Sequence, residues 1–228
     1  MSATQIPDIS VDFIDNSDQR TLCVLILDGS GSMSGQKIDA LNAGLVSLQK
    51  SLSKDTVARG RVRLLILRVG DDNAVTVESD WTDAINFVAP TIEANGTTPL
   101  GGALNLAMDK IDEEKNNMKN AGVAYTRPLV WIITDGEPTD MSEWESAARR
   151  SVSYMRDKKI QVYCIGVEVS DLNPLKMTQP GAHILQLANL DFSELFNFLS
   201  ASVSSLSKVT PGTDIQVAVP PTLMPFSA

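Results

Sequence analysis

Short runs of Val, Ile and Leu recur along the chain, and most are bounded by clusters of Gly, Asn, Asp or Ser. Runs of this length and composition are typical of strands in a sheet that is covered on both faces. The pattern predicts strands over residues 21–27, 62–69, 74–79, 129–134, 160–167 and 184–187. Because a turn signal over residues 70–73 separates the second run from the third, we expect these two to form an antiparallel hairpin.

Apolar residues in other segments recur every three or four positions, which is the spacing of an amphipathic helix. The stripes run from Ile38 to Leu52, from Leu100 to Ile111, from Trp144 to Met155 and from Phe192 to Leu206. Asp140 and Glu143 have capping-box spacing, so we expect them to cap the third helix. The alternation predicts an α/β fold: a doubly wound, mostly parallel central sheet with one antiparallel edge strand and helices on both faces.

The remaining segments complete the expected organisation. We expect residues 1–20 to form an N-terminal arm, residues 21–208 the folded domain, and residues 209–228 an extended tail that contains Pro. Within the arm, residues 11–14 are a candidate strand, and residues 81–88 are expected to form a short helix or turn. Residues 171–174 are expected to form a loop or a short helix.

The first apolar run ends in a cluster of oxygen-bearing side chains. Asp28, Ser30 and Ser32 alternate with Gly29 and Gly31, so the backbone can curl and turn three side chains toward one point. Oxygen ligands, few of them charged, suit a hard cation such as Mg2+. We expect Asp28 to lie in a surface loop, where its replacement by Ala costs little stability.

Two further segments supply the groups that complete such a site. Residues 95–100 form a turn with hydroxyls, and the run 129–134 ends, like the first, in Asp-Gly. The set Asp-x-Ser-x-Ser, Thr-Pro-Leu and Thr-Asp-Gly resembles the von Willebrand factor A (VWA) domain and its metal-ion-dependent adhesion site. The resemblance implies a divalent cation, Mg2+ first and Mn2+ or Ca2+ otherwise, bound by Asp28, Ser30, Ser32, Thr98 and Asp135. Thr98 is preferred to Thr97 because it precedes Pro-Leu.

Four stretches are most similar to the bacterial tellurium-resistance-type VWA proteins, namely residues 27–35, 95–101, 134–140 and 196–204. This resemblance implies a small intracellular protein that is not an enzyme and that serves a stress response. It also implies a protein partner that offers a Glu or Asp carboxylate to the metal, with kinase- or phosphatase-like proteins as candidates. The sequence departs from the pattern at Gly29, where relatives often have a larger residue, and we expect a looser loop there.

An enzyme on a Rossmann-like fold is the alternative class. Three glycines within residues 29–35 make a loose dinucleotide fingerprint, but Asp28 would place a carboxylate next to the pyrophosphate. A metal-dependent hydrolase is the other form of this alternative, and a serine of this loop with Asp135 and His183 would make a triad. The Gly-x-Ser-x-Gly elbow of such hydrolases is absent.

Composition and charge limit which classes of partner and which cellular compartment we expect. The net charge of −9 disfavours nucleic acid, whose phosphates need a basic surface. No apolar run reaches the ~18 residues of a membrane span, and residues 1–20 lack the apolar core of a signal peptide, so we expect a cytoplasmic protein. If the strands follow the VWA order, one strand separates Cys23 from Cys164, which at roughly 9–10 Å is too far for a disulfide.

Overall fold

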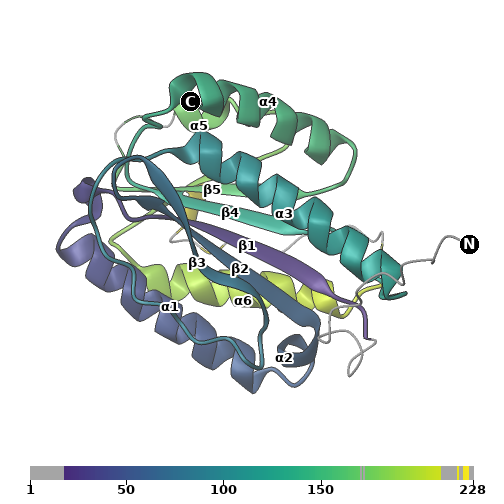
Figure 1. Ribbon diagram of the computed structural model, residues 1–228. Helices are drawn as coiled ribbons and strands as arrows, with labels where there is room; N and C mark the ends of the chain where they lie inside the picture. The colour runs from purple at the N-terminus through teal and green to yellow at the C-terminus, as the bar shows by residue number, and fades with distance from the viewer. Residues whose placement is uncertain (1–17, 170, 172, 212–219, 221–222, 226–228) are drawn as a thin grey trace, which may run out of the picture.

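A seven-stranded sheet forms the centre of the computed structural model, which describes residues 18–169, 171, 173–211, 220 and 223–225 (Figure 1). Its strands are β1 (Thr21–Asp28), β2 (Val62–Gly70), β3 (Ala74–Asp83), β4 (Leu129–Thr134), β5 (Gln161–Val167), β6 (His183–Leu187) and β7 (Leu223–Pro225). Their spatial order is β3-β2-β1-β4-β5-β6-β7. The five inner strands run parallel, which confirms the predicted doubly wound sheet, and β3 is the expected antiparallel edge strand.

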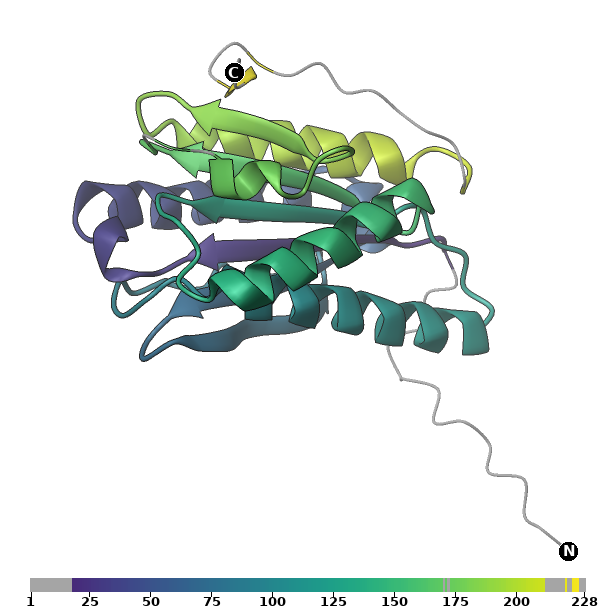
Figure 2. The same ribbon diagram turned by 90° about the horizontal axis from the view of Figure 1, so that it is seen from above.

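Helices cover both faces of the sheet (Figure 1 and Figure 2). They are η2 (Gly31–Met33), α1 (Gln36–Lys54), α2 (Ala58–Arg61), α3 (Leu100–Asn120), α4 (Met141–Arg156), α5 (Asn173–Lys176) and α6 (Phe192–Ser207). Helices α1 and α6 pack on one face, and α3 and α4 on the other. No helix in the described part of the chain is both long enough and apolar enough to cross a membrane.

Strand β1 joins the two halves of the core. Its side chains alternate between the faces, so Leu25 packs in the α1/α6 layer while Val24 and Ile26 pack in the α3/α4 layer. All three side chains are fully buried, as an inner parallel strand requires. Full burial on both faces explains why this run is apolar throughout rather than alternating.

The strand order reverses next to β1. The chain passes from β1 to β2 on one side, and β4 returns to the other side of β1. In open α/β sheets, ligands bind outside the carboxyl ends of the strands at such a switch point. The register pairs Leu27 with Ile133, so the loops that begin at Asp28 and Asp135 emerge from the same edge.

The sheet differs from the prediction at both edges. Strand β3 continues to Asp83, so the first residues of the segment 81–88 are strand rather than helix or turn. A second antiparallel strand, β7, lies within the predicted tail and pairs with β6, where Leu223 is 1% exposed.

Short α5 lies partly in the segment 171–174, where a loop or short helix was expected. The candidate strand 11–14 falls outside the described residues.

Asp140 does not form the predicted capping box. Its side chain accepts no hydrogen bond from the first turn of α4, although its backbone carbonyl accepts from Glu143. The carboxylate instead accepts the N–H groups of Gly101 and Gly102, at 3.1 and 2.9 Å, in the first turn of α3. The spacing correctly indicated a capping residue, but in the folded protein the Asp140 side chain caps α3 rather than α4.

Both cysteines are buried free thiols, as expected. Cys23 lies on β1 and Cys164 on β5, and β4 separates these strands. Burial raises the pKa of both thiols, to about 12 at Cys164. Both therefore remain protonated core side chains at neutral pH.

Candidate metal centre

Asp28 is the last residue of β1, and its carboxylate is fully buried. One oxygen, Oδ1, accepts the backbone N–H of Ser30 at 2.8 Å, and the other accepts the hydroxyl of Thr134 at 2.5 Å. The prediction that Asp28 lies in a surface loop is therefore wrong. One contact comes from the loop after β1 and the other from the end of β4, so the pairing of these two strands positions the carboxylate.

A chain of hydrogen bonds links the two loops. The hydroxyls of Ser30 and Ser32 lie 3.0 Å apart, and the Ser32 hydroxyl donates to Asp135 Oδ1 at 2.7 Å. The second oxygen of Asp135 accepts from Lys37 Nζ at 2.6 Å. The Asp135 side chain is fully buried, whereas Ser32 is exposed, so the oxygen cluster opens to the surface at Ser32.

Thr98 reaches this cluster from the loop before α3. Gly96 accepts the Gly31 N–H at 3.1 Å, and its φ of +70° suits glycine, since an added Cβ would meet the backbone of Asp71 at 2.5 Å. Thr98 itself is 5% exposed. A Cβ added at Gly136 would lie 4.0 Å from Thr98 Oγ1, which places this hydroxyl beside the loop of Asp135. The structure thus brings all five sequence-predicted site residues to one edge of the sheet.

Gly29 tightens the loop rather than loosening it. Its N–H donates to Val69 at 2.7 Å, and its carbonyl accepts the Asn95 N–H at 2.7 Å. A Cβ at this position would lie 2.9 Å from the backbone oxygen of Glu93 and 2.9 Å from Arg68 Cδ. The expected looser loop is therefore wrong, because the missing side chain permits a close backbone approach that fixes the Thr98 segment.

Burial disfavours the charged form of the Asp28 carboxylate. Desolvation raises the pKa of Asp28, and the nearby charge of Asp135 raises it further, against the lowering effect of hydrogen bonds from Thr134 and Ser30. A buried carboxylate is unfavourable unless charge or hydrogen bonds compensate it. Nowhere in the described part of the chain do three or more His, Cys, Asp or Glu side chains form a metal-binding group. A cation at this centre would therefore be bound by two carboxylates and by hydroxyls.

Lys37 is the residue that the sequence analysis missed. It lies in the first turn of α1, where a cation is unfavourable because the helix dipole is positive at that end. A lysine in this position, directly after the Asp-x-Ser-x-Ser loop, is a signal that another interaction compensates it. The ion pair with Asp135 is that interaction.

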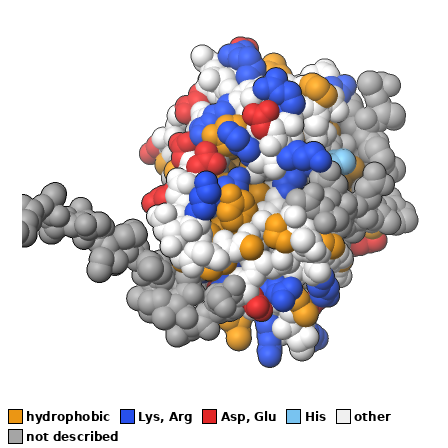
Figure 3. All heavy atoms as spheres, turned by 90° about the vertical axis from the view of Figure 1, so that its right-hand side faces the viewer, with side chains coloured by type: hydrophobic (Ala, Val, Ile, Leu, Met, Phe, Trp, Pro, Cys, Tyr) orange, Lys and Arg blue, Asp and Glu red, His pale blue; other side chains and the backbone are white. Residues whose placement is uncertain are grey.

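His183 lies too far away to complete a hydrolase triad. It begins β6, and the register aligns it with Tyr163 and Trp131, so it is two strands from β4. Asp135 lies four residues beyond Trp131, which is about 13 Å along the strand. The ring stacks on Tyr163 with centroids 4.8 Å apart. It is the one His of the sequence and is coloured pale blue on the surface in Figure 3.

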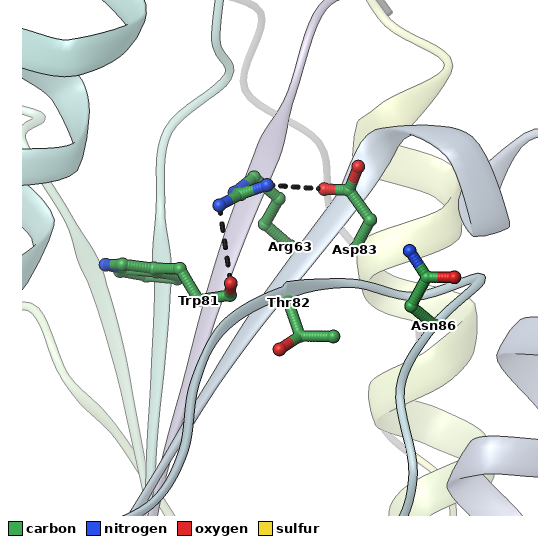
Figure 4. A pocket seen from close by; sticks show the side chains of 5 residues that line it. All are labelled: Arg63, Trp81, Thr82, Asp83 and Asn86. Atoms are coloured by element: carbon green, nitrogen blue, oxygen red, sulfur yellow. Dashed lines mark hydrogen bonds and ion pairs between the residues drawn. The ribbon is translucent and has the colours of Figure 1, made fainter. Parts of the chain in front are cut away.

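A polar pocket with a volume of about 140 Å³ lies at the opposite end of β2 (Figure 4). Arg63 lines it and forms ion pairs with Asp83 at 2.9 Å and Glu114 at 2.8 Å. The register places Arg63 beside Leu22, six residues from Asp28 and therefore about 20 Å from it. The two carboxylates compensate this arginine, and the pocket is separate from the oxygen cluster.

The fold and the oxygen cluster define the class of protein. A family model of the von Willebrand factor type A domain matches residues 23–210, and the chain belongs to this family. Domains of this family are protein-interaction and adhesion modules.

Curated relatives share this domain within much longer proteins. Heavy chain 4 of the inter-alpha-trypsin inhibitor from Mus musculus is 27% identical over 149 residues, which are 63% of this chain and 15% of that protein. Heavy chain H4 from Homo sapiens is 23% identical over 147 residues, again 63% of this chain and 15% of the relative. The chain thus matches only a small part of these relatives.

Solved structures share the fold at low sequence identity. The von Willebrand factor domain of Mfa5, a type V pili tip protein of Porphyromonas gingivalis, has a TM-score of 0.59 at 13% identity, covering 87% of this chain and 99% of that one. The pilus adhesin SpaC of Lactobacillus rhamnosus GG has a TM-score of 0.63 at 12% identity, covering 83% and 31%. These matches show a common architecture.

Two substitutions at Asp28 should separate its charge from its hydrogen bonds. Asp28→Ala leaves the Ser30 N–H and the Thr134 hydroxyl without this buried acceptor, which should cost about 1–3 kcal/mol of unfolding free energy. Asp28→Asn keeps an acceptor for Ser30 and removes the charge. Because burial raises the pKa of Asp28 in the folded state, its ionisation opposes folding.

The stability of the wild type, relative to Asp28→Asn, should therefore be greatest below the unfolded pKa near 4 and should fall as pH rises through the folded pKa. Urea unfolding in EDTA at about pH 4 and pH 7 measures this difference. An Asn variant that is as destabilised as the Ala variant at pH 7 would show that the charge itself stabilises the fold.

Proposed function

We propose that this chain is a metal-ion-dependent protein-binding module. In this proposal the side chains of Asp28, Ser30, Ser32, Thr98 and Asp135 bind a divalent cation, and the cation binds a carboxylate of a protein partner. The observation that carries it is the convergence of these oxygen groups, from three separate segments, on one edge of the sheet. The chain needs no catalytic step for this function.

The residues present fit a hard divalent cation. All five side chains offer oxygen, and only the two carboxylates are charged, which suits Mg2+, with Mn2+ or Ca2+ as alternatives. The ammonium of Lys37 already lies 2.6 Å from Asp135, so the cluster attracts positive charge in the absence of an ion. A bound ion would supply an electrophilic centre with unmet charge, because three of its five protein ligands are neutral hydroxyls.

The exposed rim gives a partner access to the centre. Gly31, Ser32, Gly96 and Thr97 are exposed, while Asp28 is fully buried beneath them. A partner carboxylate can therefore approach at the surface, whereas the protein carboxylates are held below it. Burial at the resulting interface would strengthen the interaction between the cation and the incoming carboxylate by lowering the local dielectric.

The sequence resemblance to the tellurium-resistance-type proteins supports the wider setting of this proposal. That setting is a stress response in the bacterial cytoplasm, with kinase- or phosphatase-like proteins as candidate partners. Two reduced, buried cysteines are compatible with a reducing compartment.

The Pro-containing tail is a rival contact, since proline-rich segments can bind partners without a metal. Removing the whole tail is not a clean test, because β7 pairs with β6 and Leu223 is buried against the core. Substituting Pro211, Pro220 and Pro221 by Ala leaves Leu223 in place and is the sharper design.

Ser32 and Ser34 form a matched pair for testing the cation site. Both are exposed serines, one in η2 and one directly after it, but in the described part of the chain only the Ser32 hydroxyl donates to Asp135. Ser32→Ala should weaken Mn2+ binding about tenfold, the equivalent of about 1.4 kcal/mol, whereas Ser34→Ala should leave it unchanged. Isothermal titration with Mn2+ measures both, and equal affinities in the two variants would exclude Ser32 as a ligand.

Partner binding should require the ion and a carboxylate on the partner. With a partner purified from the host, affinity should be lost in EDTA, restored by Mg2+, and retained when Pro211, Pro220 and Pro221 are replaced by Ala. Alanine substitution of acidic residues on the partner should identify one residue that carries much of the energy. If the proline variant abolishes binding while EDTA has no effect, the tail rather than the metal centre mediates the contact.

A further inference from the structure

We propose that Lys37 is an internal cation that competes with the divalent ion for Asp135 and thereby sets the ion affinity of the centre. This inference rests on the proposed cation site and concerns its regulation. It follows from the position of one ammonium group between two loops whose other polar side chains are carboxylates and hydroxyls.

The contact between Lys37 and Asp135 has the features of a strong ion pair. Nζ lies 2.6 Å from Asp135 Oδ2, and the Asp135 side chain is fully buried while that of Lys37 is 24% exposed. Charge-assisted hydrogen bonds of this length are stronger than neutral ones. The exposure of Lys37 matters equally, because a side chain with access to water can leave without moving the backbone.

Both oxygens of Asp135 already have donors. Oδ1 accepts from the Ser32 hydroxyl at 2.7 Å, and Oδ2 accepts from Lys37, whose Nζ also lies 3.4 Å from the Ser32 backbone oxygen. Two of the five candidate ligands, Ser32 and Asp135, are therefore bridged by the same ammonium. A divalent ion bound by them must displace Lys37 or tolerate its positive charge nearby.

Competition gives Lys37 two opposite effects. Without an ion, its charge offsets the cost of holding Asp135 beside the buried carboxylate of Asp28. With an ion, the same charge repels the cation and its hydrogen bond must be given up. The lysine stem has several rotatable bonds, so the ammonium can move to solvent as the ion binds.

The functional consequence is a threshold for ion loading. In the ion-free domain Lys37 occupies Asp135 and the domain stays folded. Only an ion at sufficient concentration displaces Lys37 and can then bind a partner carboxylate. Linkage requires that the stabilisation which Lys37 gives the ion-free form, and which is lost when the ion binds, appears as an equal loss of ion-binding free energy.

Three variants test this competition. Lys37→Met removes the charge and keeps the apolar stem, Lys37→Arg keeps a cation, and Lys50→Met makes the same charge change on α1 about 20 Å away. Isothermal titration with Mn2+ should show about tenfold tighter binding in Lys37→Met and affinities near wild type in the other two. In EDTA, Lys37→Met should also melt at a lower temperature than Lys50→Met, and saturating Mn2+ should remove that difference.

The outcomes separate this inference from the proposed function. If the wild type binds Mn2+ and Lys37→Met binds it equally or more weakly, Lys37 is not a competitor and the cation site stands. If neither protein binds Mn2+, the proposed cation site fails and this inference fails with it. If Lys50→Met tightens binding as much as Lys37→Met, the effect is general electrostatics and the specific competition is excluded.

Discussion

The pairing of β1 with β4 is the interaction on which the rest of the structure depends. Its parallel register sets Leu27 beside Ile133, and the next residues bring Asp28 within hydrogen-bonding reach of Thr134. Both strands are buried on both faces, and each fully buried aliphatic side chain contributes about 1.5–3 kcal/mol. The burial of this apolar core offsets the unfavourable burial of the two carboxylates at the ends of the strands.

The carboxylate cluster shows how stability and function are divided in this domain. The side chains of Asp28 and Asp135 are both buried, which is unfavourable for charged groups without compensation. Thr134 and the Ser30 N–H compensate one carboxylate, and Ser32 and Lys37 compensate the other. Because the Lys37 side chain is partly exposed to water, its ammonium can be replaced by another cation at Asp135.

The sequence predicted what local patterns determine, and it failed where distant segments decide. Apolar runs and their terminal Asp-Gly pairs placed Asp28 and Asp135 at one sheet edge, because the ends of parallel strands share an edge. The capping target of Asp140, the close approach at Gly29 and strand β7 depend on segments that are remote in the sequence. Lys37 was missed because an ion pair with a residue 98 positions away leaves no local periodicity.

The position of a bound cation is the most direct test of the proposed centre. Crystals of the wild type and of Asp28→Asn, soaked in Mn2+, can be compared in anomalous difference maps. We expect a single strong peak in the wild type among the side chains of Asp28, Ser30, Ser32, Thr98 and Asp135, and no peak there in the variant. A peak at another place, or none at this edge of the sheet under saturating Mn2+, would contradict the proposed function.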